Sequence, residues 1–208
     1  MNIFAAVSNK SVLDPLLAVV DRKSVKFWGT EGTVQYLKAK GFEAQSVVSG
    51  FDFDGRLKSI DKKVFARVLA DGSNKKHLDE LQRMFSLSHS RPDRESDIRP
   101  EDSVSRDPRF REDDGRPFDL VIVDLYPLDK KNFPESMDIG GQALIRAAIK
   151  NYKGVALAFD KSSLASLVVE LISNKGSTTL NFRKTQAQKA AKFIAEKCQV
   201  ESKMVGDL

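Results

Sequence analysis

The feature that most constrains the fold is the segment Phe118–Leu125 (FDLVIVDL), in which only two aspartates interrupt a run of apolar residues. A run of this length and composition is typical of a strand that is buried on both faces. Such strands occur in parallel sheets, where a helix joins each strand to the next and covers the sheet. The segment therefore predicts an α/β protein, provided that strands and helices alternate along the chain.

Strand-like and helix-like stretches do alternate along most of the chain. Further short apolar runs predict strands at Asn2–Ser8, Val25–Trp28, Phe42–Val48 and Gly154–Phe159. Stretches with the helical period predict helices at Ser11–Asp21, Val34–Lys40, Val64–Ala70, Lys76–Leu87, Ser162–Ser173 and Phe182–Cys198, the first of them capped by Ser11. The pattern predicts a three-layer α/β fold, with an open parallel sheet between two layers of helices.

Length and composition indicate one domain, residues 1–208, in a reducing compartment. The net charge of +5 suits an anionic ligand. It does not by itself indicate nucleic-acid binding, which would require a clustered basic face. Cys198 is the only cysteine, so an internal disulfide is impossible. No apolar run approaches the ~20 residues of a membrane span, and the N-terminus has no signal-peptide pattern. We therefore expect a cytoplasmic protein with no nucleic-acid or membrane partner.

One segment, Ser88–Pro117, departs from the alternation and has the composition of an insertion. It carries seven Arg and no Lys, whereas the rest of the chain carries six Arg and 21 Lys. Nine Asp and Glu leave it nearly neutral, which disfavours an Arg-rich arm for nucleic acid or a partner. Its phrases Ser90–Glu95 and Asp107–Asp114 resemble translated palindromic repeat elements that occur inside bacterial genes. We predict that residues 88–117 form a flexible, disordered insertion within the domain.

The stretch Met137–Asn151 is the strongest candidate for a ligand site. It combines an acid, Asp138, with two glycines that let a ligand approach the main chain closely, and an amphipathic helix follows. The start of that helix offers unpaired N–H groups and a partial positive charge, which suit an anion or a carbonyl oxygen. Taken alone, such a motif is more often an ordinary glycine turn before a helix.

Ligands of parallel sheets bind beyond the carboxyl ends of the strands. The loops predicted there are Ser8–Ser11, Gly29–Thr33, Gly50–Ser59, Asp124–Pro127 and, if it lies beside the others, Asp138–Gly141. Five motifs in these loops occur in the order of a known enzyme family: Ser8-Asn9-Lys10-Ser11, Thr30-Glu31-Gly32-Thr33, Gly55-Arg56-Leu57-Lys58-Ser59, Asp124-Leu125-Tyr126-Pro127-Leu128, and Asp138-Ile139-Gly140-Gly141 with its helix to Asn151. From Asn2 to about Ala191, the chain resembles the inosine monophosphate cyclohydrolase domain of the bifunctional purine-biosynthesis enzyme. The resemblance implies the methylglyoxal-synthase-like (Rossmann-like) version of the three-layer fold.

That family closes the purine ring of 5-formamidoimidazole-4-carboxamide ribotide (FAICAR) to inosine monophosphate (IMP) and expels water. It uses no cofactor, and the resemblance implies no metal. The catalytic residues implied are Lys150, as proton donor or acceptor, Asp138, Lys58 and Tyr126. The substrate-binding residues implied are Ser8, Asn9, Lys10, Thr30, Glu31, Gly32, Thr33, Arg56, Leu57, Lys58, Ser59, Val123, Asp124, Asp138, Ile139 and Gly140. The family's formyltransferase half has no counterpart before Leu208, so a separate formyltransferase chain is an expected partner, and a homodimer stays open.

Two acidic residues depart from the family pattern at positions expected to face the ligand. Glu31 replaces the first glycine of the family's Ser-Gly-Gly-Thr loop, and Asp124 replaces the asparagine of its Asn-Leu-Tyr-Pro-Phe motif. A carboxylate beside a phosphate is repulsive, on the order of 1 kcal/mol when partly buried. The enzyme implied by the resemblance is therefore expected to have impaired activity, or to have become a weakened binding module.

Two other functions of the same fold stay open. One is a nucleotide-sensing module similar to the allosteric domain of carbamoyl phosphate synthetase, and the other is methylglyoxal synthase. Retention of Lys58, Asp138 and Lys150 favours an enzyme over a sensor, because a sensor needs only the phosphate loops. The segment Ser8–Lys10 offers no carboxylate like the early Asp-rich base motif of methylglyoxal synthase, which disfavours that enzyme.

Overall fold

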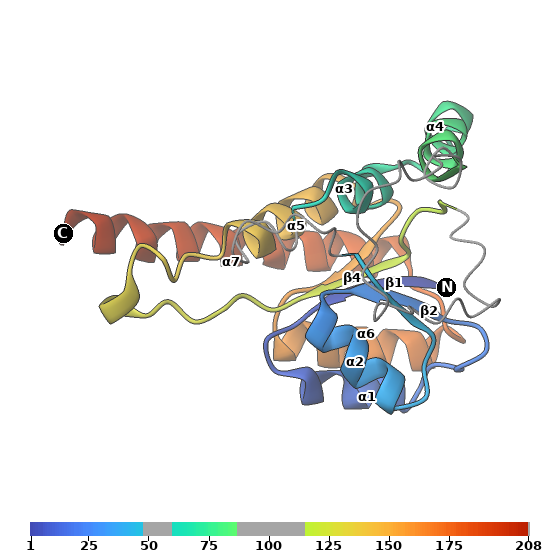
Figure 1. Cartoon of the computed structure of the whole chain (residues 1–208), viewed down its shortest axis with the longest axis horizontal. Coiled ribbons are helices and arrows are strands. Elements are labelled where there is room, and N and C mark those ends of the chain that lie inside the picture. The colour runs from blue at the N-terminus through green and yellow to red at the C-terminus, as the bar shows by residue number, and fades with distance from the viewer. Residues whose placement is uncertain (48–59, 87–114, 208) are drawn as a thin grey trace, which may run out of the picture.

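The computed structural model describes residues 1–47, 60–86 and 115–207, and it confirms the predicted α/β class. Five parallel strands form one sheet in the order β3-β2-β1-β4-β5 (Figure 1). The strands are β1 (Asn2–Ala6), β2 (Lys26–Gly29), β3 (Ala44–Ser46), β4 (Leu120–Val123) and β5 (Ala156–Ala158). Each lies within a segment that the sequence predicted to be a strand, or one residue beyond it.

Helices cover both faces of the sheet and make the three predicted layers. In Figure 1, α1, α2 and α6 lie below the sheet, and α3, α5 and α7 lie above it. The helices are η1 (Lys10–Leu13), α1 (Asp14–Leu17), α2 (Glu31–Ala39), α3 (Lys62–Leu69), α4 (Lys75–Ser86), η4 (Lys130–Asn132), α5 (Ile139–Lys150), α6 (Lys161–Ser173) and α7 (Leu180–Gly206).

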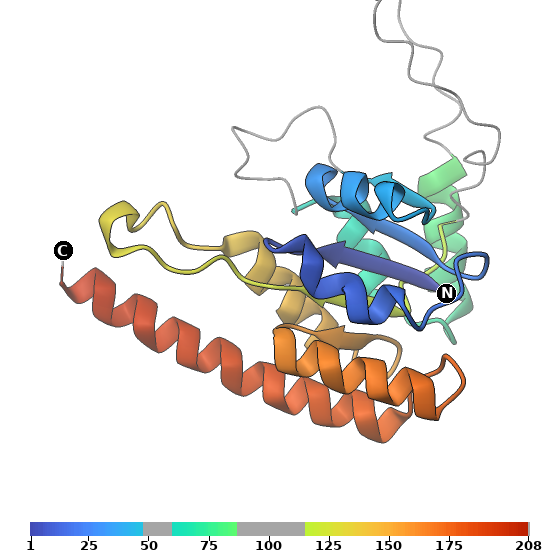
Figure 2. The same ribbon diagram turned by 90° about the horizontal axis from the view of Figure 1, so that it is seen from below.

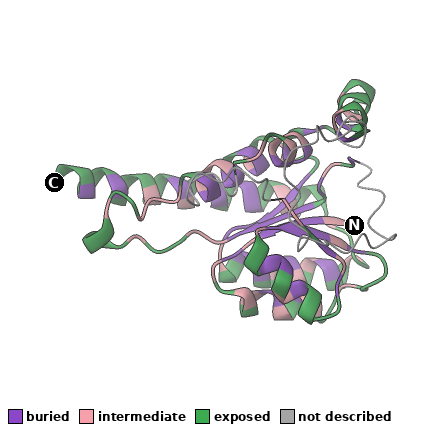
Figure 3. Ribbon diagram, viewed as in Figure 1, coloured by how far each residue is buried: buried purple, intermediate pink, exposed green. Residues whose placement is uncertain are grey.

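The core consists of two apolar layers, one on each face of the sheet. Side chains alternate between the two faces of a strand. Ile3 and Ala5 of β1 therefore pack in the layer between the sheet and helices α1, α2 and α6, whereas Phe4 packs in the layer between the sheet and helices α3, α5 and α7. All four residues of β4 are buried, as its unbroken apolar sequence predicts. Figure 3 shows the strands buried and the outer helix faces exposed.

The first two helical segments of the chain differ from the prediction in their bounds. The first helix is shorter than Ser11–Asp21, because a 3-10 turn, η1, is followed by the single turn α1. Asn9 caps it instead of Ser11, and its Oδ1 accepts a hydrogen bond from the Ser11 N–H at 3.2 Å. Helix α2 begins at Glu31, three residues before the predicted start, so the segment Glu31–Thr33 is helical and not a loop. The N-terminus of α2 is thereby brought to the end of β2.

The predicted insertion lies outside the described residues except for its last three. Gly115 is buried with φ +62°, and a side chain there would meet the Phe85 ring of α4 at 2.8 Å. The next carbonyl, of Arg116, accepts a hydrogen bond from Nε of buried Arg67 at 2.7 Å. Pro117 accepts one from the Asn2 side chain at 3.3 Å. These three residues therefore pack on the domain, unlike the flexible segment to which the sequence assigned them.

Among the described residues, none of the helices combines the length and the apolar character needed to cross a lipid bilayer.

Candidate active site

The order of the strands creates a crevice between β1 and β4. From β1 the chain moves to β2 and β3 on one side, and it then returns to place β4 on the other side of β1. Loops that leave two such strands diverge, and ligands of open α/β sheets bind in the space between them. Ala6 pairs with Val123 at the carboxyl ends of these strands, so Ser8 and Asp124 follow at the same edge.

A cavity of about 1210 Å³ opens at this edge. Most of the predicted ligand-binding residues that the structure describes line it. They are Ser8, Lys10, Thr30, Glu31, Gly32, Val123, Asp124, Asp138, Ile139 and Gly140, together with the predicted catalytic residue Tyr126. The crevice therefore brings together four of the five predicted motifs, whereas Gly55–Ser59 lies outside the described residues.

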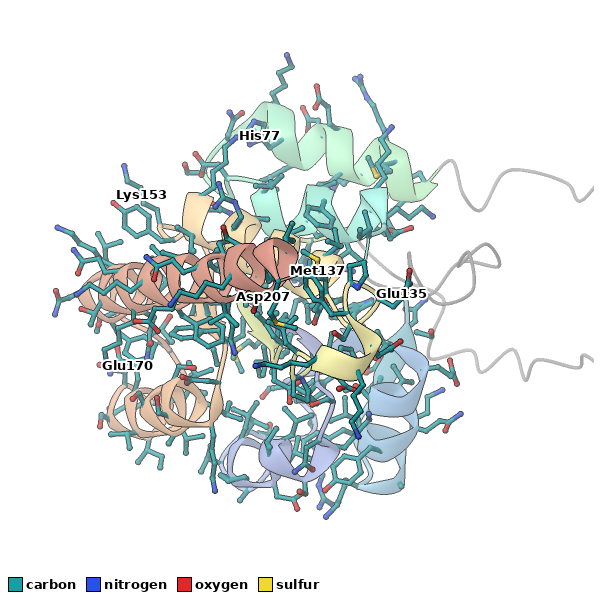
Figure 4. The ribbon with its side chains drawn as sticks, turned by 90° about the vertical axis from the view of Figure 1, so that its left-hand side faces the viewer. His77, Glu135, Met137, Lys153, Glu170 and Asp207 are labelled. Atoms are coloured by element: carbon teal, nitrogen blue, oxygen red, sulfur yellow. The ribbon has the colours of Figure 1, made fainter. Side chains whose placement is uncertain are left out.

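One wall of the cavity was not predicted from the sequence. It is built by the segment between β4 and α5, through Asp129, Asn132, Pro134, Glu135 and Ser136, and it leads to Met137, the first residue of the predicted ligand-site stretch. Ser136 joins the two arms of this segment, because its Oγ donates to the Asp129 carbonyl at 3.0 Å and accepts from the Asp129 N–H at 3.1 Å. Figure 4 shows Glu135 and Met137 on it, and Figure 2 shows it projecting on the same side of the molecule as the end of α7. In the sequence, the only indication of this segment was its position between two of the predicted motifs.

One end of the cavity has the features of an anion site. Thr30 is the N-cap of α2 with extended backbone, and no side chain among the described residues caps the helix there. The first N–H groups of α2 are therefore open to a ligand, at the positive end of the helix. Lys10 lies beside them: a Cβ built on Gly32 would be 3.8 Å from Lys10 Nζ. Lys10 also donates to the Ser8 carbonyl at 2.8 Å, which holds the ammonium group at this end.

Glu31, the unexpected acid of this loop, is exposed and lies on the first turn of α2. Its Oε1 accepts a hydrogen bond from Gln35 Nε2, one turn further along the helix, at 3.2 Å. This contact gives the carboxylate a partner on α2, although Glu31 still lines the cavity. A negative charge in the first turn also stabilises the helix through its dipole.

Asp138 is held at the start of α5 by two backbone N–H groups. Its Oδ1 accepts from Gly141 at 2.7 Å, and its Oδ2 accepts from Tyr126 at 3.3 Å. Burial raises the pKa of Asp138, the two hydrogen bonds oppose that rise, and the negative charge of Asp124 adds to it. Gly141 is required here, because a Cβ would lie 2.6 Å from Asp138 Oδ2 and 2.7 Å from Leu125 Cδ2. The second glycine of the motif thus makes room for the carboxylate.

Tyr126 lines the cavity beside Asp138, to which its N–H donates, and the residue is 60% exposed. Partial burial, followed by the charges of Asp138 and Asp124, raises the pKa of Tyr126. Its hydroxyl therefore stays protonated at neutral pH and is available as a hydrogen-bond donor.

Lys150 is not brought to the cavity, although the resemblance implies that it transfers protons. Helix α5 connects two parallel strands, β4 and β5, so it must run from the carboxyl edge of the sheet back to the amino edge. Lys150 ends that helix, about 18 Å from Asp138 along its axis by helical rise. Its neighbour Asn151 ties this far end to α3, by donating to the Val68 and Ala70 carbonyls at 2.8 and 2.9 Å.

Other predicted residues have structural partners or lie outside the described chain. Asn9 caps η1 through its side chain and does not line the cavity. Thr33 is fully buried, with its hydroxyl 3.3 Å from that of Thr30, so it supports the loop from behind. The predicted residues outside the described part are Arg56, Leu57, Lys58 and Ser59. Within the described part, no group of three or more His, Cys, Asp or Glu side chains is placed to hold a metal ion.

The chain is similar in sequence to proteins named bifunctional purine biosynthesis protein PurH. It is 31% identical over 202 residues to that of Clostridium kluyveri, which covers 91% of this chain and 34% of the relative. It is 31% identical over 197 residues to that of Bradyrhizobium diazoefficiens, covering 89% and 32%. The Cereibacter sphaeroides protein is 30% identical over 216 residues, covering 98% and 35%. The chain thus spans about a third of the length of the curated relatives it matches.

Among solved structures, the fold is similar to that of a crystal structure of ForH. That structure superposes with a TM-score of 0.73 at 22% sequence identity, and it covers 99% of this chain and 97% of the other. No family model matches the chain. The sequence relatives show that the chain belongs to the family of the bifunctional purine biosynthesis protein PurH, of which it matches about one third.

Proposed function

We propose that this chain is an IMP cyclohydrolase, which closes the purine ring of FAICAR with loss of water in purine biosynthesis. One observation carries the proposal: in a PurH relative, one cavity is lined both by the start of α2 with Lys10, which suit an anion, and by Asp138 with Tyr126. A ribotide substrate has the same two parts, a phosphate and a ring that reacts. The cavity therefore offers contacts to both parts of this class of ligand.

In this proposal the phosphate binds at the start of α2. The open N–H groups of the first turn and the Lys10 ammonium supply hydrogen bonds and positive charge. Arg56, Lys58 and Ser59, which precede the described residue Ile60, remain predicted substrate contacts by resemblance to the family.

The reacting groups then lie between Asp138 and Tyr126. Ring closure joins the carboxamide nitrogen to the formyl carbon, and the two are already in one molecule, so orientation is the main requirement. The carboxamide and formamide nitrogens each lose one proton, and both protons leave with the formyl oxygen as water. We propose that ionised Asp138 accepts a hydrogen bond from the carboxamide N–H, while the Tyr126 hydroxyl donates to the formyl oxygen.

Lys150 has no direct part in this proposal, because it ends α5 at the opposite edge of the sheet. Lys58 keeps the assisting role that the resemblance implies. The step that adds the formyl group is proposed to come from a formyltransferase, as the bifunctional relatives suggest.

A nucleotide-binding module without turnover is the second candidate. The observation that favours it is the pair of carboxylates, Glu31 and Asp124, on the cavity wall. Both are already engaged, however: Glu31 accepts from Gln35, and Asp124 accepts from Ser8. This engagement supports the enzyme over the module.

The decisive assay follows the ultraviolet absorbance of IMP as purified protein acts on FAICAR. We expect formation of IMP above the uncatalysed rate, and a loss of roughly 100-fold in the matched variant Asp138→Asn. Asparagine keeps the oxygen that caps α5 but cannot be ionised, so the fold should survive. Tight binding of IMP with no catalysed ring closure would assign the chain to the binding modules.

A further inference from the structure

Asp124 occupies both hydrogen-bond donors of Ser8. Its Oδ1 accepts from the Ser8 N–H, and its Oδ2 accepts from the Ser8 hydroxyl at 2.9 Å. The Ser8 carbonyl is also engaged, because it accepts from Lys10 Nζ at 2.8 Å. Ser8 therefore has no donor left for an anion, and among the residues that the structure describes here, α2 and Lys10 supply the donors for a phosphate.

Asp124 and Asp138 face the same part of the cavity. Both line it, and the N–H of Tyr126, two residues after Asp124, donates to Asp138 Oδ2 at 3.3 Å. The negative charge of Asp124 also contributes to the raised pKa values of Asp138 and Tyr126. An ionised carboxylate has about four acceptor positions and no donor. Each of these carboxylates uses two of the four on the protein, Asp124 on Ser8 and Asp138 on Gly141 and Tyr126. Acceptor capacity therefore remains on both for a ligand.

We propose that Asp124 determines ligand specificity: with Asp138 it forms an acceptor-only pair that selects ligands with amide or amine N–H groups and rejects a carboxylate there. The inference rests on the proposed function for the orientation of the ribotide, with its phosphate at α2. A buried or half-buried acceptor that finds no donor loses its hydrogen bonds to water, so a ligand without donors binds weakly.

Asparagine at position 124 would not act in the same way. The two Ser8 donors reach different oxygens of Asp124, and in asparagine an NH₂ group replaces one of these oxygens, so in the same geometry one Ser8 donor would lose its acceptor. The asparagine amide group would also bring two donors into the cavity. The aspartate therefore makes this end of the cavity more selective than the family's asparagine would.

The test measures the affinity of two ribotides that differ at one group. 5-Aminoimidazole-4-carboxamide ribotide presents a carboxamide NH₂, and the corresponding 4-carboxylate ribotide presents an anionic oxygen in its place. Titration calorimetry measures both affinities. We expect the wild-type protein to bind the carboxamide ribotide at least about tenfold more tightly than the carboxylate ribotide. Asp124→Asn should reduce this ratio of affinities by about fivefold or more.

Ser8→Ala is the matched control, because it removes one bond of Asp124 but keeps the charge. It should retain the wild-type ratio of the affinities for the two ribotides, because the charge of Asp124 stays in the cavity. An unchanged ratio in Asp124→Asn, or an equal loss of ratio in Ser8→Ala, overturns the inference and reduces Asp124 to support of the Ser8 loop.

The ring-closure assay and the two ribotide affinities, measured on the wild type and Asp124→Asn, test the proposed function and this inference separately. Catalysed ring closure together with an unchanged ligand ratio would overturn only the role of Asp124. A ratio that depends on Asp124, without any ring closure, would support the inference and overturn the cyclohydrolase.

Discussion

At the scale of single residues, the ionisation of Asp138 offers the most direct test of the site. Burial raises its pKa first, and the charge of Asp124 raises it further. The proposed reaction needs the ionised form, so the rate should fall as the pH drops through this pKa. Asp124→Asn removes one negative charge and stabilises ionised Asp138, so the acid limb of kcat/KM should move to lower pH.

The measurement is a pH–rate profile of the wild type and Asp124→Asn, with Tyr126→Phe as control. Tyr126 should stay protonated across the acid range because its pKa is raised, so its loss should lower the rate without moving the acid limb. An acid limb at the same pH in the wild type and in Asp124→Asn would show that another group controls it.

The position of Lys150 leads to a prediction that differs from the family resemblance. It is exposed at the amino edge of the sheet, about 18 Å from Asp138 by helical rise. We expect Lys150→Ala to keep kcat/KM within about threefold of the wild type, which is under ~1 kcal/mol of transition-state stabilisation. A loss as large as that of Asp138→Asn would mean that Lys150 reaches the chemistry by a route outside this arrangement of the chain.

At the scale of elements, the start of α5 depends on a glycine. A methyl group at Gly141 would lie 2.6 Å from the Asp138 carboxylate and 2.7 Å from Leu125. Gly141→Ala should therefore displace the carboxylate, reduce ring closure and lower the free energy of unfolding by about 1–3 kcal/mol. Thermal unfolding and the IMP assay measure the two effects.

Gly72→Ala is the matched control for that change. A Cβ at Gly72 meets nothing within 4 Å, and the residue lies between α3 and α4, in a turn that does not line the cavity. We expect its melting temperature and activity to match those of the wild type. Equal effects of the two substitutions would show that the close approach at Gly141 is relieved by movement of Leu125.

At the scale of the whole molecule, the segment between α4 and β4 can be tested by replacement. A Gly-Ser linker in place of residues 88–114, with the segment Gly115–Pro117 kept, should change the melting temperature little and preserve activity. The only large apolar side chains that the linker removes are Ile98, Val104 and Phe110. Closing a loop costs only about 0.6 kcal/mol more for each doubling of its length.

Extending the replacement through Pro117 provides the contrast. A flexible linker does not hold its main chain in one position, so the close approach of Gly115 to Phe85 and the carbonyl placed to accept from Arg67 Nε would be lost. Burial of Arg67 without that acceptor should cost on the order of 1–3 kcal/mol. Equal stability of the two replacements would contradict the structural role of the segment Gly115–Pro117.

The sequence alone determined the elements and the fold class, because their signals are local. The apolar run around β4 and the helical periods predicted a parallel sheet between helices, and five short motifs pointed to a ligand site at loop ends. Each such signal depends on residues close in the chain, whose period is set by the geometry of a strand or helix.

Only the tertiary structure decided which of these residues meet. Strand order places β4 beside β1, and this order joins Asp124 to Ser8 and opens the cavity between their loops. The direction of α5 separates Lys150 from Asp138, although one motif contains both. The wall between β4 and α5 has no sequence signal of its own, and it lines the cavity because of where its ends are anchored. The local periods of a sequence do not specify strand order or the long-range contacts that follow from it.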